Sequence, residues 1–158
     1  MPKVATLALA IAAGLAAGCG GGSLVAPTAT VDQGTQVAPN RYLADATSGA
    51  AAVRTFTQEL AAMGPTATPA GLKSVAPRLM APLDQARLVG QRLLAERLAD
   101  RRLEEQRSRT SAAFQNVVAA MEGVVTAAGA GDPQAARTAN TSLHTAIDAL
   151  RAASTSTG

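Results

Sequence analysis

Few side chains in this sequence have the type and spacing needed for chemistry. Cys19 is the only cysteine and His144 the only histidine in 158 residues. Nucleophilic catalysis needs a base beside the nucleophile, and His144 is the only conventional base available to the many serines. The adjacent acids Glu104 and Glu105 lie in a charge-rich run, where we expect a solvated helix face. We therefore predict no catalytic residues and no enzyme activity.

The same scarcity argues against metals and cofactors. A haem-binding bundle needs an inward-pointing His and Met, and Met63, Met80 and Met121 have the spacing of core filler. A carboxylate-bridged metal site in a bundle needs a Glu-x-x-His repeat, which this chain lacks. We predict no metal site and no cofactor, and we expect His144 at a boundary or solvent position.

Cys19 follows a segment with the layout of a secretion signal. Lys3 makes the start weakly basic, and residues 4–17 form an uncharged run of 14 residues. A membrane-spanning helix needs about 20 apolar residues, so this run is too short to span a bilayer and suits the apolar part of a signal peptide. Small residues follow the run, and only small side chains fit the narrow pocket of a signal peptidase.

The processing site resembles the lipobox of bacterial lipoproteins and consists of Leu15, Ala16, Ala17, Gly18 and Cys19. In that family the cysteine thiol receives a diacylglycerol and the leader is cut off before it. The resemblance implies lipid attachment at Cys19, removal of residues 1–18 and a location outside the cytoplasm, anchored to the cell membrane. The alternative is an ordinary secretory signal with a chance cysteine.

Residues 19–40 are expected to form a flexible tether. They begin with three glycines, contain Pro27 and Pro39, and show no helical period. A flexible chain of about 20 residues has a mean span of roughly 25 Å. A tether of this length would lift the folded part clear of the lipid headgroups.

The composition favours helices over sheets in the remaining chain. Aromatic residues make up 2% and charged residues 16% of the sequence, and alanine dominates. Alanine and leucine are strong helix formers, whereas a sandwich or barrel needs β-branched and aromatic residues. Residues 41–153 are long enough for one small domain, followed by a frayed tail at 154–158. Nucleic acid is not an expected partner, because no aromatic residues interleave the arginines.

Apolar residues at steps of three and four predict four helices. The first covers 41–63, with Asn40 as its N-cap and Gly64-Pro65 as its end, and buries Leu43, Ala46, Ala50, Val53, Phe56, Leu60 and Met63. The second starts at Thr68-Pro69, is kinked or broken by Pro77 and Pro82, and then runs to 98. Its stripe is Leu79, Leu83, Ala86, Gly90 and Leu94.

The third helix has the least certain start. We place a turn near residues 99–102, with one long helix over 77–128 as the alternative. Its stripe is Phe114, Val117, Val118, Met121, Val124, Val125 and Ala128. The fourth begins at Asp132-Pro133 and buries Ala136, Leu143, Ile147 and Leu150. Short connections favour antiparallel neighbours, so the fold class is an all-α, up-and-down bundle of four helices, or of three with one long central helix.

The most individual stretch of the mature chain is the arginine-rich segment 87–109. A solvated face with ion pairs such as Arg92–Glu96, Arg101–Glu105 and Glu104–Arg107 is one interpretation. The other is a patch for an anionic partner, made of Arg92, Arg97, Arg101, Arg102, Arg107 and Arg109.

Two functions fit these observations. The first is a membrane-anchored binding module for an envelope protein or anionic polymer. The second is a carrier that holds a small apolar ligand within the bundle. Composition and layout also resemble small, Ala- and Arg-rich helical lipoproteins of high-GC bacteria. The oligomeric state is left open.

Overall fold

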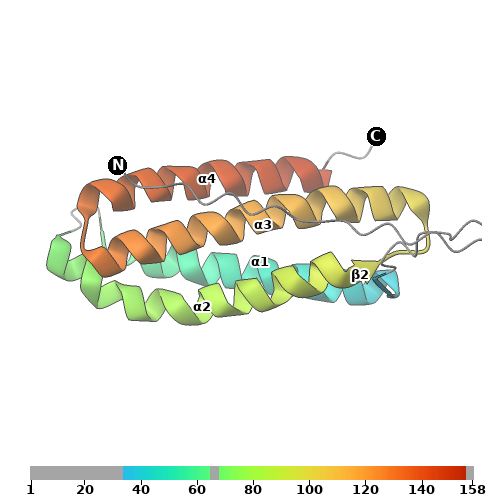
Figure 1. Cartoon of the computed structure of the whole chain (residues 1–158), viewed down its shortest axis with the longest axis horizontal. Helices are drawn as coiled ribbons and strands as arrows, with labels where there is room; N and C mark the ends of the chain where they lie inside the picture. Colours follow the sequence, from blue (N-terminus) through green and yellow to red (C-terminus); the bar gives the residue numbers. More distant parts are fainter. Residues whose placement is uncertain (1–33, 65–67, 156–158) are drawn as a thin grey trace, which may run out of the picture. The chain divides into compact units, whose positions relative to one another are not determined.

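A computed structural model describes residues 34–64 and 68–155. Within these ranges the chain forms four helices and one short strand pair (Figure 1). The helices are α1 (Pro39–Ala61), α2 (Pro69–Ala95), α3 (Arg101–Ala130) and α4 (Pro133–Thr155). The strands are β1 (Thr35–Gln36) and β2 (Glu96–Arg97). The predicted all-α, up-and-down four-helix bundle is confirmed.

Local capping chemistry explains where α2 and α4 begin. The Thr68 hydroxyl accepts a hydrogen bond from the Gly71 N–H at 3.1 Å. One Asp132 carboxylate oxygen accepts from the N–H groups of Gln134 and Ala135 at 2.9 and 3.0 Å. These are the orphan donors that an N-cap satisfies, and both predicted caps are confirmed.

The start of α1 differs from the prediction. Ala38 precedes the helix, Pro39 occupies its first turn, and no side chain caps it. The Asn40 side chain accepts only from the N–H of its neighbour Arg41 at 2.9 Å. Asn40 as N-cap is therefore wrong, because proline in the first turn, which lacks an N–H, already moves the helix start upstream.

The prolines of α2 neither break nor end it. The helix is continuous from Pro69 to Ala95 through Pro77 and Pro82, so a break at these prolines is wrong, and the kink stays a prediction. Proline leaves the carbonyl four residues earlier without its helical donor, and these carbonyls belong to Lys73 and Arg78, both solvent-exposed residues. Buried residues on both sides of the prolines belong to one core cluster, and this packing stabilises the continuous helix.

α2 and α3 are separate helices, so the predicted turn is confirmed and the single long helix is wrong. α2 ends because Glu96 adopts an extended backbone with φ −74° and ψ 150°. α3 begins at Arg101, where the Asp100 carboxylate accepts from the Leu103 N–H at 2.9 Å. Residues 96–100 contain neither Gly nor Pro, and the capping aspartate is the local signal for the turn.

The ordered part of the chain begins before residue 41, the predicted domain boundary. Strand β1 pairs in parallel with β2, with Thr35 opposite Glu96 and Gln36 opposite Arg97. The Val37 N–H donates to the Arg97 carbonyl at 2.9 Å. The expected tether therefore does not stay free up to residue 40, because its last residues are hydrogen-bonded to the α2–α3 connection.

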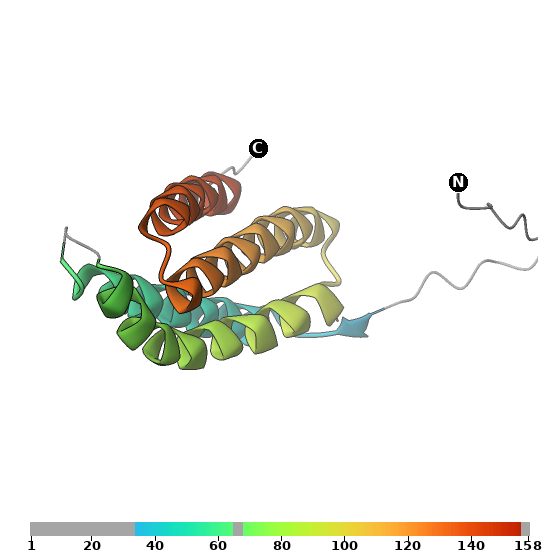
Figure 2. The same cartoon turned by 60° about the vertical axis from the view of Figure 1, so that its left-hand side comes forward.

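The two ends of the bundle differ, and we name them for what they carry. The strand end holds the β1–β2 pair, the starts of α1 and α3, and the ends of α2 and α4 (Figures 1 and 2). The loop end holds the α1–α2 and α3–α4 connections. Gly131 closes α3 there with a positive φ of 68°, a conformation that favours glycine.

One apolar cluster from all four helices forms the core. Its fully buried members include Phe56, Leu72, Leu79, Val117 and Leu143. Four predicted core residues are wrong: Leu43 is 61%, Leu94 47% and Met80 40% exposed, and Ala50 is exposed as well. In α1, alanines lie next to the buried face, so the apolar pattern fits two helix faces that differ by one residue position. In α2 the neighbouring Leu93 is buried in place of Leu94.

Phe114 of α3 occupies a slot beside Gly49 of α1. A Cβ at Gly49 would lie 2.9 Å from the Phe114 ring, whereas one at Gly90 of α2 would lie 3.5 Å from it, which is an ordinary contact distance. Phe114 is 3% exposed. Close packing of this ring against α1 therefore depends on the missing side chain at Gly49.

We expect Gly49→Ala to lower the free energy of unfolding by about 1–3 kcal/mol, because the added methyl overpacks against the ring. Gly123→Ala is the matched control, since its Cβ would lie 3.8 Å from its nearest neighbour. There, the better helix propensity of alanine should raise the free energy of unfolding by about 1 kcal/mol. Urea unfolding followed by circular dichroism measures both changes. Equal effects of the two substitutions would contradict the slot.

Candidate functional site

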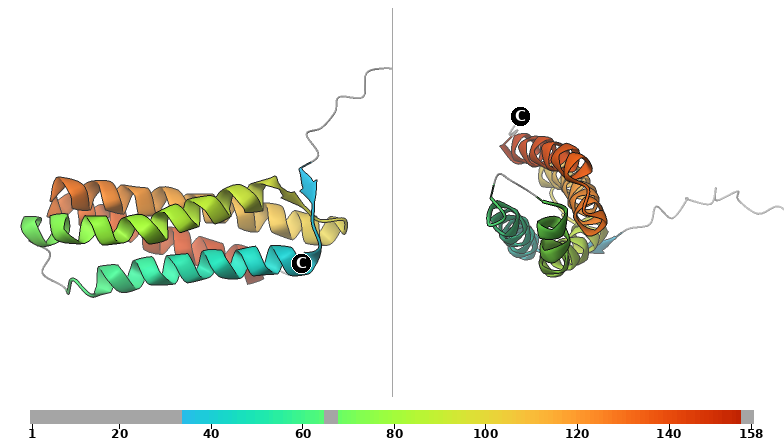
Figure 3. Two further views of the ribbon diagram at one scale, coloured as in Figure 1. Left: turned by 90° about the horizontal axis from the view of Figure 1, so that it is seen from below. Right: turned by 90° about the vertical axis from the view of Figure 1, so that its left-hand side faces the viewer.

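The helices pack in sequence, and one seam of the bundle remains open. α1 packs on α2, α2 on α3, and α3 on α4, whereas α1 and α4 are not a packed pair. The end-on view in Figure 3 shows α4 lying on α3 and apart from α1. In α4, only Leu143 of the predicted stripe is fully buried, because α1 does not cover the rest.

Two hollows lie along this seam. The central hollow has a volume of about 430 Å³ and is lined by Ala50, Val53, Arg54, Thr57, His144, Ile147, Leu150 and Arg151. The hollow at the loop end has a volume of about 230 Å³ and is lined by Leu60, Met63, Gly64, Leu72, Val124, Ala128, Pro133, Ala136, Arg137 and Asn140. We call the two together the α1–α4 groove.

The groove has an apolar floor and a largely basic rim. Ile147, Leu150 and Ala136 are only partly buried there, although they pack against the core. At 1.5 Å per residue, the span of α1 from Ala50 to Met63 makes the groove about 20 Å long. Such a trough can hold an extended apolar or amphipathic object, and it offers no constellation for covalent chemistry.

The rim carries Arg54, Arg137, Arg151 and His144. Among residues 34–64 and 68–155, the one acid paired with a rim arginine is Asp148, which lies 2.9 Å from Arg151. His144 is exposed, as the sequence predicted. An anionic or acid-flanked partner would therefore be favoured over a basic one.

No protein-family profile, curated protein or solved structure gives a significant match to this chain. Function has to be argued from the described residues themselves. In residues 34–64 and 68–155, no three or more His, Cys, Asp or Glu side chains are grouped so that they could hold a metal ion. No helix in the same ranges has both the length and the apolar character to cross a membrane.

The lipobox residues lie outside the described part of the chain. These are Leu15, Ala16, Ala17, Gly18 and Cys19. Lipid attachment and leader cleavage therefore stay predictions from the sequence.

The arginine-rich segment gathers at the strand end, and one of its arginines points inward. Arg107 is 4% exposed. Its guanidinium holds the Glu104 carboxylate in a two-pronged pair, with distances of 2.8 and 2.7 Å. It also donates to the Leu93 carbonyl at 2.7 Å. Arg107 therefore caps the end of α2 and is not available to an anionic partner, which corrects the predicted patch.

A local pattern could have revealed this role. Arg107, Ser111, Phe114 and Val118 follow one another at steps of four and three, which places Arg107 on the core face of α3. The Ser111 hydroxyl shares the same acceptor, the Leu93 carbonyl, at 3.1 Å. Because this stripe begins with the polar residues Arg107 and Ser111, an apolar pattern alone does not reveal that the buried face of α3 extends to them.

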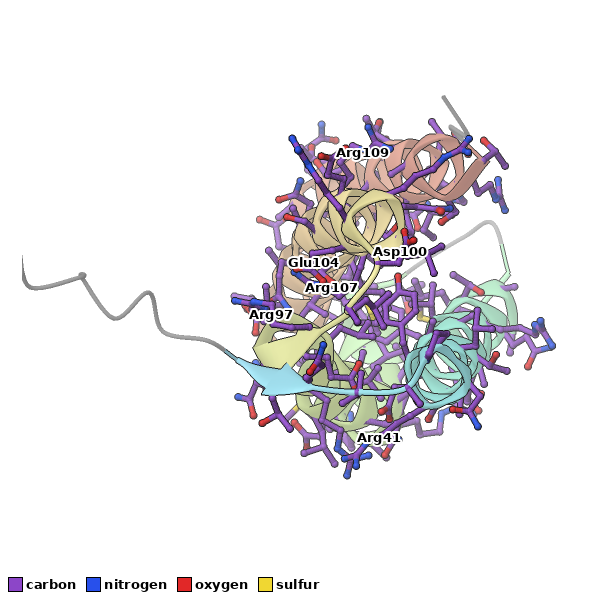
Figure 4. All side chains as sticks on the ribbon, turned by 90° about the vertical axis from the view of Figure 1, so that its right-hand side faces the viewer. Arg41, Arg97, Asp100, Glu104, Arg107 and Arg109 are labelled. Carbon is purple, nitrogen blue, oxygen red and sulfur yellow. The ribbon has the colours of Figure 1, made fainter. Side chains whose placement is uncertain are left out.

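The other patch arginines lie toward the surface. Arg92 is 3.4 Å from Asp45, so its predicted pairing with Glu96 is wrong. Arg97 is 3.9 Å from Glu104, and the predicted Arg101–Glu105 pair forms at 3.1 Å. Arg102 and Arg109 are exposed. Figure 4 looks onto this end, with Glu104 and Arg107 together near its middle.

A buried carboxyl group lies where β2 meets α1. Glu96 is 4% exposed, and neither carboxylate oxygen accepts a hydrogen bond. Arg41, 67% exposed, is its nearest cation at 3.7 Å. Burial, followed by the neighbouring Asp45 carboxyl, raises the pKa of Glu96, because both disfavour its charged form.

We expect Glu96→Gln to raise the free energy of unfolding at pH 7 by on the order of 1 kcal/mol, because it removes a buried, unsatisfied charge. Burial raises the folded-state pKa of Glu96. The free energy of unfolding of the wild type therefore falls as the pH rises above the ordinary pKa of a glutamate. The difference between the two proteins should therefore shrink toward pH 4, where the Glu96 carboxyl of the unfolded state is also becoming protonated.

Urea unfolding at pH 4 and pH 7 tests this. Glu105→Gln is the control, because Glu105 is exposed and its pair with Arg101 contributes little. A lower stability of Glu96→Gln at pH 7 would contradict the prediction.

Proposed function

We propose that this protein is a lipid-anchored module of the bacterial cell envelope that binds an amphipathic helix of an envelope protein in the α1–α4 groove. The observation that carries the proposal is the open seam, where α4 keeps a half-buried apolar stripe that no helix of the bundle covers. The lipobox at Cys19 supports the location, and the groove supports the kind of partner.

The dimensions of the groove favour a helix. A trough about 20 Å long matches a helix of about 13 residues, which is between three and four turns. Helix-in-groove recognition places apolar residues at steps of three and four onto such a floor. Arg54, Arg137 and Arg151 on the rim favour acidic residues on the flanks of that helix. The partner is therefore an amphipathic helix with acidic edges.

A carrier of a small apolar ligand is the second candidate. The apolar lining of the loop-end hollow favours it, including Leu60, Met63 and Leu72. However, ligand pockets are usually about 300–1,000 Å³ and enclose most of the ligand. The loop-end hollow has only about 230 Å³, and the central hollow, although about 430 Å³ in volume, opens along the seam and would not enclose a ligand. We therefore prefer the helical partner.

Designed peptides of about four helical turns test the groove. One carries leucines at steps of three and four with glutamates on the flanks, a second has lysines on the flanks, and a third is a scrambled form of the first. We expect the acid-flanked peptide to bind most tightly in fluorescence anisotropy and to gain helicity on binding.

Two aspartate variants locate the binding site. Ile147→Asp places a charge on the groove floor and should weaken binding roughly tenfold or more. Ala149→Asp is on the same helix but lines a hollow on the opposite side of α4, between α3 and α4, and should leave binding unchanged. Loss of binding in Ala149→Asp alone would contradict the groove. If no peptide binds, but an apolar dye does and is excluded by Met63→Trp, the carrier would replace the proposal.

A further inference from the structure

We infer that the strand end of the bundle docks directly onto a bilayer surface of anionic lipid. This goes beyond the groove and rests only on the lipid anchor of the proposed function. Three separate observations meet at this end: outward arginines, outward leucines and the entry of the chain that comes from Cys19.

The charges of the strand end are partly sorted by sign. Apart from the buried Arg107, its arginines lie toward the surface, with side-chain exposures of 67% for Arg41 and 93% for Arg101. Two acids are turned inward, with exposures of 14% for Asp45 and 5% for Glu96, whereas Asp100 and Glu105 are exposed. Arginines therefore outnumber acids on the outer surface of this end.

Two further acids of this end have donors within the fold. Glu104 is bound by Arg107 and also accepts from the Leu98 N–H at 2.8 Å. Asp100 is exposed and caps α3 through the Leu103 N–H. These bonds hold both carboxylates in place, while Arg41, Arg92 and Arg97 each lie within 4 Å of an acid.

Exposed leucines occupy the same end. Leu43 lies near the start of α1, Leu94 in the last turn of α2 and Leu103 in the first turn of α3. Their exposures are 61%, 47% and 40%. Large apolar side chains among arginines are typical of surfaces that sit in the headgroup region, where the apolar parts enter the acyl boundary. A purely polar anionic polymer would make no apolar contacts with these leucines.

The tether brings this end to the membrane. β1 is hydrogen-bonded to β2 at the strand end, so the chain from Cys19 enters the bundle there. The sequence predicts a tether for the 14 residues between Cys19 and Gly34, and a flexible chain of that length has a mean span of roughly 20 Å. With a lipidated Cys19, the tether would hold the strand end at high local concentration beside the headgroups.

Vesicle binding by an unlipidated protein tests the inference. The protein is the chain from residue 19 with Cys19→Ser, which keeps the whole compact unit 32–158. We expect it to sediment with phosphatidylcholine vesicles that contain phosphatidylglycerol and not with pure phosphatidylcholine, with affinity falling as salt rises.

Two matched charge reversals locate the surface. Arg101→Glu/Arg102→Glu changes the strand end and should weaken binding to the anionic vesicles roughly tenfold or more. Lys73→Glu/Arg78→Glu makes the same net change on α2, nearer the loop end, and should weaken it much less. Equal losses, or no binding to the anionic vesicles at all, would overturn the inference.

A fluorescent label separates lipid from polymer. Because Cys19 is the only cysteine, Leu103→Cys and Leu88→Cys in the Cys19→Ser protein can each carry one environment-sensitive dye. Leu103 and Leu88 are 40% and 44% exposed, so the two positions are matched. We expect a blue shift on anionic vesicles at 103 and none at 88. Equal shifts would overturn docking by this end. Binding to vesicles and to a soluble anionic polymer alike, without a shift at 103, would assign the end to polymers instead. These tests use no groove partner, so their failure leaves the groove proposal standing.

Discussion

Arg107→Ala is expected to lower the free energy of unfolding by about 3–5 kcal/mol, the usual cost of removing one partner of a buried ion pair. For a domain of this size that would be a large part of the total stability. Arg107 bonds the Glu104 carboxylate twice and the Leu93 carbonyl once. Its loss leaves both acceptors short of donors at the point where α2 ends and α3 begins.

Chemical denaturation and a matched variant check this expectation. Arg101→Ala removes an arginine that is six residues away and 93% exposed, and its cost should stay below about 1 kcal/mol, as for other surface pairs. The double variant Glu104→Gln/Arg107→Met removes both charges together and should recover part of the loss. Equal costs for Arg107→Ala and Arg101→Ala would contradict the capping role.

The Arg107–Glu104 pair also predicts an acid-side signature. The bond from Arg107 lowers the pKa of Glu104 below its usual range. A carboxyl with a lowered folded-state pKa contributes stability above its unfolded pKa, and that contribution is lost as pH falls through the folded value. The wild type should therefore lose stability below about pH 4.5 more steeply than Arg107→Ala does.

Cys19→Ser is expected to abolish the attachment of the protein to the bacterial membrane fraction that survives a high-salt wash, because only the salt-sensitive docking of the strand end would remain. An acyl chain on the thiol is the only attachment that the lipobox predicts, and serine cannot form the thioether. Intact mass measures the chemistry directly. The protein extracted from membranes should have the mass of residues 19–158 plus acyl chains, and the variant should lack the acyl mass.

Ser23→Ala is the control for this experiment, because it changes a nearby polar residue and leaves the cysteine in place. It should stay in the membrane fraction with its acyl mass. An unmodified mass and release to the medium for both the wild type and Cys19→Ser would mean that Cys19 is a chance residue beside a cleavage site. The proposed anchor would then be wrong.

The sequence predicts those features that a few neighbouring residues determine. The starts of α2 and α4 follow from a capping side chain and a proline in adjacent positions, Thr68-Pro69 and Asp132-Pro133. The turn between α2 and α3 was harder to place, because its signal is the single cap Asp100. The sequence pattern places Leu43 and Leu94 in the core, because the apolar pattern of an alanine-rich helix fits two faces that differ by one residue position.

Features that depend on distant parts of the chain could not be predicted. Whether the first and last helices close the bundle depends on crossing angles set by α2 and α3, so the periodicity of α4 gives no sign of the open seam. The pairing of Thr35 with Glu96 joins residues 61 positions apart. Both residues are polar and neither lies in a run that resembles a strand.

The β1–β2 pair also determines where mechanical load would enter the fold. A pull on the chain before Gly34 reaches β1 first, and the parallel ladder passes it to the α2–α3 connection through backbone hydrogen bonds, including the one between Val37 and Arg97. That connection is stabilised in turn by Arg107, which donates a hydrogen bond to the Leu93 carbonyl near the end of α2. Tension on an anchored molecule would thus be shared by three helices, and the first turn of α1 would be shielded from being peeled away on its own.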